Sequence, residues 1–541
     1  MKIGFLSLFF LISAFSWAQI PSTRFFVEFV DKGSSSFSLQ RPSEFLSQRS
    51  IERRLKFNIP LDSSDLPVTA AYISSIQRLG GLIHCTSKWF NGVVVEPIDS
   101  QSWENIKLLP CVKSTQPVFK LKRTDDPWVE PAATEGVASF PDSVYGIGLT
   151  QVKQLNLQSL HQEGFTGKGV WIAVLDAGFI NVPSIAAFQH LFTEGRIVGN
   201  RDFVDRDNDP FNGDIHGTLV LSCMAAKLPG VMIGTAPDAK YTLLRTEDVG
   251  SERRIEEFNW IAGAEYADSL GVDVFNTSLG YTWYDPIDSM QQITQAQLDG
   301  NTTYITRGAD LAAKKGILVV NSAGNEGGSA WGNISAPSDG DSVFCIGAVD
   351  SSGFRAGFSG RGLSSQHIKP NVMALGARTP LLNHNGNPST GSGTSFSGPV
   401  IAGAMACLVQ AFPQKNNWEL MKAVEKSSSQ FQNPDTLMGY GIPDFGKVYQ
   451  ALNQWNKYFP KDQDFCLVFP NPVGTNSRIV FKEAYASVTL RLWDSRGRLI
   501  KQWNIANQMS EDLSWISQMQ QGAYFLDVET ELLQTRIRLV H

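Results

Sequence analysis

Val170-Trp171-Ile172-Ala173-Val174-Leu175-Asp176-Ala177-Gly178 is an apolar run that ends in a carboxylate and a glycine. Its unbroken apolar character indicates a strand covered on both faces, as in a parallel sheet. Similar apolar runs follow at residues 240–244, 272–275, 317–320 and 343–349. Helical patterns alternate with them at residues 217–227, 253–270, 304–315 and 395–412. This alternation predicts an α/β domain with a mostly parallel sheet over residues 144–453.

Three of the predicted strands are followed by polar or glycine-containing segments. Asp176 ends the first run, and the segment Ser278-Leu279-Gly280 follows the run at 272–275. Asn325 follows Ser322-Ala323-Gly324 after the run at 317–320. In sheets of this kind, ligands and chemistry gather beyond the carboxyl ends of the strands. We therefore expect these segments to share one functional edge.

Two further motifs offer a base and a nucleophile. His216 lies in Asp214-Ile215-His216-Gly217-Thr218, and Ser395 lies in Gly393-Thr394-Ser395-Phe396-Ser397-Gly398-Pro399, each where a helix is predicted to begin. Acyl transfer needs an orienting acid, a base, an oxyanion donor and a nucleophile. Asp176, His216, Asn325 and Ser395 match these roles in that order. The Ser395 N–H would be the second oxyanion donor.

Each of the four residues also has an ordinary structural role. An Asp at a strand end accepts turn N–H groups, and a His or Ser at a helix start can act as a cap. An Asn beside Gly is common in left-handed turns. The functional hypothesis therefore depends on all four occurring together, at strand ends and helix starts.

The chain order Asp, His, Ser and the letters of the motifs resemble those of subtilisin-like serine proteases, the subtilases, over about residues 144–453. The resemblance implies a subtilisin-like three-layer domain and a secreted serine endopeptidase that forms an acyl-enzyme on Ser395. It also implies that the substrate peptide binds along Ser278, Leu279, Gly280 and Gly324.

The chain departs from the family pattern at Leu219, where histidine is common, and at Phe396-Ser397, where Met-Ala is usual. Neither change removes a catalytic atom. The alternative function is a catalytically inactive subtilase scaffold that serves in surface binding or adhesion. Such a protein would normally lack at least one of the four catalytic residues, and this chain keeps them all.

The chain before the catalytic domain divides into three parts. Residues 1–18 combine Lys2, an apolar centre at 6–12 and the small-residue site Ser16-Trp17-Ala18, which is typical of a secretory signal peptide. Residues 19–123 show a strand–helix–strand–strand–helix–strand order, which predicts a small α+β sandwich. This part resembles the inhibitory propeptide of subtilases. The resemblance implies that it templates folding, lays its last strand into the cleft and is removed by cleavage in the linker 124–143.

Residues 465–541 change character to short alternating strands separated by Gly, Asn and Asp, which predicts a small all-β sandwich. They resemble the C-terminal sorting domain of type IX secretion substrates in Bacteroidetes. The matching features include Phe469-Pro470-Asn471-Pro472 and Gly522-Ala523-Tyr524-Phe525-Leu526. The resemblance implies a type IX secretion machinery as partner and export to the cell surface or medium. A carbohydrate-binding or spacer module is the alternative.

Composition excludes several other functions. The net charge of −6 over 541 residues, without a Lys/Arg stripe, argues against nucleic-acid binding. No stretch beyond the signal peptide is long enough and apolar enough to span a membrane. The resemblance to subtilases implies protein or peptide substrates as partners. Of the six cysteines, only Cys85 and Cys111 are candidates for a disulfide bond.

No cofactor is required by the proposed chemistry. Structural Ca²⁺ is common in subtilases, and oxygen ligands crowd one loop, at Asp202, Asp205, Asp207, Asn208 and Asp209. Their spacing does not match an EF-hand, and a solvated acidic loop is the favoured interpretation.

Overall fold

The computed structural model describes residues 23–33, 35–118, 143–285, 292–364, 367–458, 465–481, 485–508, 510–531 and 533–541. The signal peptide and most of the linker 124–143 lie outside these residues. The chain forms two compact units, residues 1–448 and 449–541.

The larger part of the first unit, after the linker, is built on a parallel sheet of seven strands in the order β13-β12-β11-β10-β5-β9-β6. The strands are β5 (Trp171–Asp176), β6 (Ile197–Asp202), β9 (Lys240–Arg245), β10 (Val274–Thr277), β11 (Leu318–Ser322), β12 (Phe344–Val349) and β13 (Val372–Leu375). β10, β11 and β12 are buried along their whole length, which explains their continuous apolar sequences. The predicted parallel α/β fold is confirmed.

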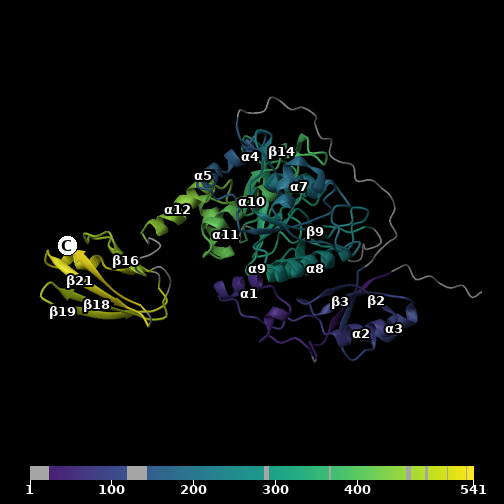
Figure 1. Cartoon of the computed structure of the whole chain (residues 1–541), viewed down its shortest axis with the longest axis horizontal. Coiled ribbons are helices and arrows are strands. Elements are labelled where there is room, and N and C mark those ends of the chain that lie inside the picture. Colours follow the sequence, from purple (N-terminus) through teal and green to yellow (C-terminus); the bar gives the residue numbers. More distant parts are fainter. Residues whose placement is uncertain are drawn as a thin grey trace, which may run out of the picture. The chain divides into compact units, whose positions relative to one another are not determined.

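Helices cover both faces of this sheet (Figure 1). On one side lie α7 (His216–Ala225) and α10 (Thr394–Ala411), and on the other lie α8 (Ile255–Leu270) and α9 (Tyr304–Lys314). Smaller elements are α4 (Leu149–Gln154), α5 (Gln158–Gln162), α6 (Gln189–Thr193), α11 (Asn417–Ser427), α12 (Phe445–Tyr458) and the hairpins β7–β8 (Lys227–Leu228, Met232–Ile233) and β14–β15 (Thr379–Leu382, Pro388–Gly391). Among the described helices, α10 alone has the length and apolar character of a membrane span, but 78% of it is buried inside the protein.

The N-terminal region forms an antiparallel sheet in the order β2-β3-β1-β4. Its elements are β1 (Phe25–Phe29), α1 (Gln48–Lys56), α2 (Ala70–Arg78), β2 (Gly81–Ser87), β3 (Gly92–Pro97), α3 (Ser100–Lys107) and β4 (Val112–Pro117). The Ser47 hydroxyl caps α1 by accepting from the Ser50 N–H, and Asp99 caps α3 in the same way. The predicted α+β region is confirmed.

Buried ion pairs join the N-terminal region to α8. Arg53 and Arg54 of α1 contact Asp268 at 2.5 and 2.9 Å, and Arg54 also contacts Asp65 at 2.7 Å. Burial would raise the pKa of Asp268, but the charges of Lys88, Arg54 and Arg53 outweigh it and hold that pKa below its ordinary value. One hydrophobic cluster contains residues of both parts, including Phe26, Trp89, Phe258 and Ile261.

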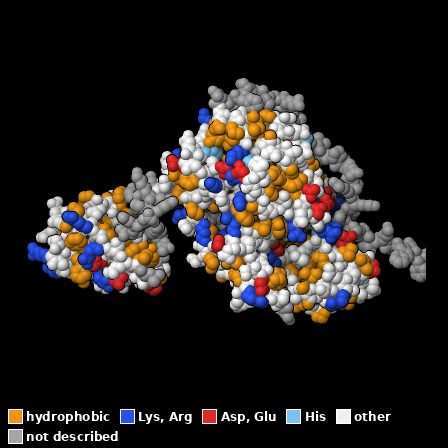
Figure 2. All heavy atoms as spheres, viewed as in Figure 1, with side chains coloured by type: hydrophobic (Ala, Val, Ile, Leu, Met, Phe, Trp, Pro, Cys, Tyr) orange, Lys and Arg blue, Asp and Glu red, His pale blue; other side chains and the backbone are white. Residues whose placement is uncertain are grey.

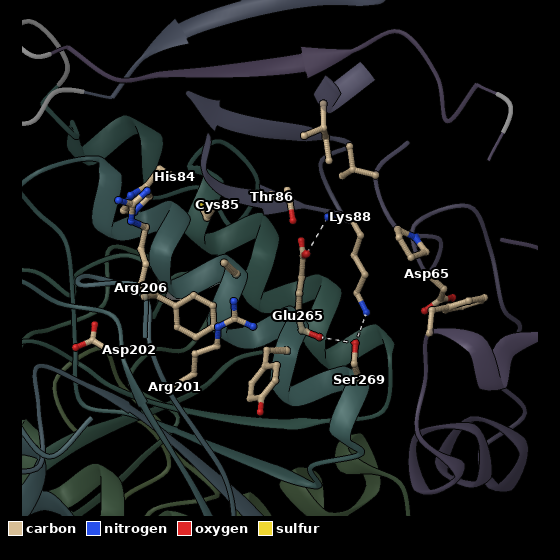
Figure 3. A pocket seen from close by; sticks show the side chains of 17 residues that line it. Asp65, His84, Cys85, Thr86, Lys88, Arg201, Asp202, Arg206, Glu265 and Ser269 are labelled. Atoms are coloured by element: carbon tan, nitrogen blue, oxygen red, sulfur yellow. Dashed lines mark hydrogen bonds between the residues drawn. The ribbon is translucent and has the colours of Figure 1, made fainter. Parts of the chain in front are cut away.

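A cavity of about 410 Å³ lies beside this contact, between β2 and the outer surface of α8 (Figure 3). His84, Lys88, Arg201 and Glu265 are among the side chains that line it. Glu265 accepts hydrogen bonds from the Lys88 and Trp89 N–H groups. The lining contains neither Asp176, His216 nor Ser395, so this cavity is separate from the candidate catalytic residues.

The second unit contains two antiparallel sheets, β16-β17-β20 and β19-β18-β21-β22. Their strands are β16 (Cys466–Phe469), β17 (Arg478–Phe481), β18 (Val488–Asp494), β19 (Leu499–Ile505), β20 (Ser510–Asp512), β21 (Ala523–Glu529) and β22 (Gln534–Val540). Alternate residues of β18 are buried, as expected for a sheet with one face on a core. The predicted all-β domain is confirmed. Cys85 and Cys111 are both free thiols, so the expected Cys85–Cys111 pairing is wrong.

Candidate active site

Asp176 and His216 form a direct hydrogen bond. Asp176 ends the central strand β5 and is fully buried, and His216 is the first residue of α7. The His216 Nδ1–H donates to Asp176 Oδ1 over 2.7 Å, and the Ala177 N–H donates to the same oxygen over 2.8 Å. Asp214 accepts from the His216 N–H at 2.8 Å and so holds the start of the helix. These contacts fix the imidazole with Nε2 free to act as an acceptor.

The electrostatic setting of His216 favours its protonated form. Burial alone would lower the pKa of His216, but the charge of Asp176 and the hydrogen bond to it outweigh this effect. The pKa of His216 is therefore raised above its ordinary value of 6.5. An imidazole in this position is a stronger base than a free one and gains further stability when it takes a proton.

Ser395 is the second residue of α10, and its neighbours are positioned by an unusual hydrogen bond. Pro399 lies inside the helix and has no N–H for the Ser395 carbonyl four residues earlier. The Ser278 hydroxyl donates to that carbonyl over 2.9 Å and replaces the missing helical bond. The segment after β10 is thereby held against the start of α10.

The Ser395 hydroxyl itself contacts the Ser278 carbonyl oxygen at 3.4 Å. Within the described residues, no hydrogen bond joins Ser395 to His216. The two residues are nonetheless near neighbours, because the ring of Phe396, next to Ser395, lies 6.1 Å from the His216 ring between centroids. The structure thus brings the start of α10 to the imidazole but leaves the hydroxyl turned toward Ser278.

Asn325 follows β11 and is oriented by Thr394. Its Oδ1 accepts from the Thr394 N–H at 2.8 Å and from the Thr394 hydroxyl at 3.0 Å. The Gly324 N–H donates to the same hydroxyl over 3.1 Å. Because both bonds occupy the amide oxygen, the Asn325 Nδ2 group is left as a donor beside Ser395. Thr394 was not singled out from the sequence, although it stands in the quoted Gly-Thr-Ser string.

The segment Ser278-Leu279-Gly280 lies beside the loop after β11. The Leu279 carbonyl accepts from Asn321 Nδ2 over 3.3 Å, and Leu279 packs against the hydrophobic cluster under α8. A Cβ atom at Gly280 would lie 2.0 Å from the Ser335 hydroxyl oxygen, so only glycine fits there. The residues expected to bind substrate thus surround the start of α10.

The acidic loop near His216 is organised by a guanidinium group. Arg245 donates to Asp202 at 2.7 Å, to Asp205 at 2.6 Å and to Asn212 at 3.0 Å. Asp202 is fully buried, so the expected solvated loop is wrong at this residue. Since Arg245 already supplies the cation, these oxygens do not fit a Ca²⁺ site. No group of three metal-binding side chains occurs in the described part of the chain.

Comparisons with known proteins match three segments. Residues 167–441 match the subtilase family, residues 24–130 the Peptidase S8 propeptide domain of Bacteroidota, and residues 467–540 a secretion system C-terminal sorting domain. Subtilisin E of Bacillus subtilis is 30% identical over 288 residues, which cover 52% of this chain and 66% of that protein. Subtilisin of Bacillus pumilus is 29% identical over 284 residues, covering 51% and 90% respectively. The match therefore spans just under two thirds of Subtilisin E.

Proposed function

This chain belongs to the subtilase family, and from that premise we propose that it is a secreted serine endopeptidase that hydrolyses peptide bonds. The observation that carries the proposal is the 2.7 Å hydrogen bond between the buried Asp176 and His216, whose ring adjoins the start of the helix that contains Ser395. A buried carboxylate that holds the imidazole in one tautomer leaves the second ring nitrogen able to accept a proton. This arrangement activates a hydroxyl nucleophile.

In the proposed reaction, rotation of the Ser395 side chain moves its hydroxyl from Ser278 toward His216 Nε2. The imidazole takes the proton as the Ser395 oxygen attacks the substrate carbonyl carbon. Asn325 Nδ2 and the Ser395 N–H stabilise the negative oxygen of the tetrahedral intermediate. His216 then gives its proton to the departing amine. Water repeats the attack on the acyl-enzyme and frees Ser395.

The test is labelling by a fluorophosphonate, which reacts with an activated serine. We expect the chain to be labelled once its N-terminal region has been removed, and we expect Ser395→Ala to remove all labelling. A folded wild-type chain that resists the probe would contradict the proposal and favour the inactive binding protein. No observation in the described residues favours that alternative, since all four candidate catalytic residues are present.

We also propose that residues 1–18 direct export and that the sorting domain at 465–541 carries the protein across the outer membrane. The match to a sorting-domain family supports this role. Deletion of 465–541 is expected to leave folded protein in the periplasm, measured by fractionation. A normal amount in the medium would contradict the sorting role. Protein or peptide substrates and the type IX machinery are the proposed partners.

A further inference from the structure

The start of α10 is held to the sheet by hydroxyl groups from two neighbouring strands. The Ser322 hydroxyl, at the end of β11, donates to the Thr394 carbonyl over 2.8 Å. The Ser278 hydroxyl, just after β10, donates to the Ser395 carbonyl over 2.9 Å. Because β10 and β11 are adjacent parallel strands, both hydroxyls extend from the same edge of the sheet.

The two carbonyls differ in what else can bind them. The Thr394 carbonyl also accepts from the Ser397 hydroxyl over 3.0 Å. The Ser395 carbonyl is four residues before Pro399, which has no N–H and whose ring crowds a carbonyl at that spacing. The Ser278 hydroxyl therefore supplies the hydrogen bond that residue 399 cannot donate.

The Ser278 hydroxyl is in turn oriented by Asn276. Asn276 is a fully buried residue of β10 and pairs with Val174 on one side and Val320 on the other. Its Nδ2 group donates to Ser278 Oγ over 3.2 Å. A hydroxyl has one hydrogen and two acceptor sites, so this donor leaves the Ser278 hydrogen directed at the Ser395 carbonyl. A chain of hydrogen bonds thus runs from the interior of the sheet to Ser395.

The carbonyl that Ser278 holds belongs to the same residue as the candidate nucleophile. The Ser395 hydroxyl contacts the Ser278 carbonyl at 3.4 Å, so each serine side chain bonds to the backbone of the other. A shift of the Ser395 backbone would move its Oγ and its N–H together. In the proposed reaction these are the attacking atom and an oxyanion donor, and a displacement of about 1 Å can cost about 100-fold in rate.

We propose that Ser278 and Asn276 are positioning residues for the nucleophile. The Ser278 hydroxyl holds the Ser395 backbone in place of the helical bond that Pro399 removes, and the Asn276 amide orients that hydroxyl. Neither side chain takes part in bond making or bond breaking. This inference rests on the proposed function and adds two side-chain roles to its site.

The first test compares Ser278→Ala with Ser397→Ala in the full chain after it has processed itself. Both substitutions remove a hydroxyl that donates to a carbonyl at the start of α10. The readouts are kcat and KM for one quenched peptide that the wild-type enzyme cleaves. Active sites are counted by fluorophosphonate labelling of a parallel sample.

We expect Ser278→Ala to lower kcat per active site by about tenfold or more, because the nucleophile is displaced. KM should change by less than about twofold, since the lost contact acts on the reacting atoms. The control Ser397→Ala should lower kcat by no more than about threefold, because Ser322 still donates to the Thr394 carbonyl.

The second test restores the missing helical donor. Pro399→Ala supplies an N–H four residues after Ser395, so in that background Ser278→Ala should lower kcat by no more than about threefold. A merely structural role for Ser278 would lower the unfolding temperature and the number of labelled sites, but it would leave kcat per site unchanged.

The third test concerns the orienting amide. Asn276→Leu keeps the approximate size of the side chain and should lower kcat by about threefold to tenfold. In the Ser278→Ala background it should have no further effect, because Asn276 acts through that hydroxyl. If Asn276→Leu does not fold, Asn276→Ala replaces it in the same comparison.

An unchanged kcat in Ser278→Ala, a change in KM alone, or an equal loss with and without Pro399→Ala would each overturn this inference and leave the proposed function intact. A folded wild-type chain that neither reacts with the probe nor cleaves any peptide would overturn both.

Discussion

The regions on either side of the catalytic domain are attached in different ways. The N-terminal region shares a compact unit, a hydrophobic cluster and buried ion pairs with the catalytic domain. The C-terminal region forms its own unit around its own hydrophobic cluster. Its ion pairs are more exposed, as in Arg536 with Asp527, where the arginine side chain is 62% exposed. Figure 2 shows charged side chains spread over both units. The first region thus packs against the catalytic domain, whereas the second has a hydrophobic core of its own.

The strongest way to separate the two regions is to remove the nucleophile. Ser395→Ala is expected to reduce self-cleavage of the N-terminal region by about 10⁶-fold, since no acyl-enzyme can form. Export of the chain should continue, because the proposed sorting role of residues 465–541 does not use Ser395. Mass spectrometry of the exported chain measures both events. Unchanged release of the N-terminal region would assign that cleavage to another protease.

The next largest effect is expected at Asp268, in the Ser395→Ala chain so that the regions stay joined. Asp268→Ala leaves Arg53 and Arg54 buried without their shared partner, which costs about 3–5 kcal/mol. Hydrogen exchange at the amides of β2 should report this loss as easier opening of the N-terminal region. Exchange in β21 of the second unit is the internal control. Equal changes in both strands would mean that the effect is not local.

Acid should weaken the same contact. The pKa of Asp268 is held below its ordinary 3.8, so its stabilising contribution is complete above that value and is lost as pH falls toward the lowered pKa. In the Ser395→Ala chain, protection of β2 should therefore fall below about pH 4. Asp268→Asn should flatten that pH dependence. A slope that survives the substitution would assign the acid sensitivity to other groups.

The smallest effect is expected in the second unit. Arg536→Ala removes an exposed partner of Asp527 and should change the free energy of unfolding by no more than about 1 kcal/mol. Urea unfolding followed by the fluorescence of Trp503 and Trp515 would measure it. If Arg536→Ala lowered the free energy of unfolding as much as Asp268→Ala is expected to, the ion pairs of the two regions would not differ in strength as we expect.

The central part of the fold could be predicted because its strands are covered on both faces. The apolar runs that end near Asp176 and Asn325 carry that signal directly. β6 and β13 were not predicted. Both are edge strands of the sheet, and β6 also has a polar sequence. An interior strand can be recognised by its continuous apolar sequence, whereas an edge strand often lacks this signal.

Only those residues of the candidate site that lie in recognisable sequence motifs could be predicted. Asp176 and His216 meet as expected, while the Ser395–His216 hydrogen bond stays a prediction. Thr394 has no distinctive sequence pattern, because its importance comes from contacts between segments far apart in the chain. The hydrogen bond from the Ser278 hydroxyl to the Ser395 carbonyl likewise could not be predicted from the sequence, because the fold brings these two segments together.

Thr394 connects Asn325 to the start of the helix that contains Ser395. Its N–H and hydroxyl both donate to Asn325 Oδ1, and its carbonyl accepts from the Ser322 hydroxyl at 2.8 Å. In the proposed mechanism, the oxyanion donor Asn325 and the nucleophile Ser395 are therefore joined through Thr394, and we expect the distance between them to vary little. His216 begins a different helix, so we expect the distance between base and nucleophile to vary more.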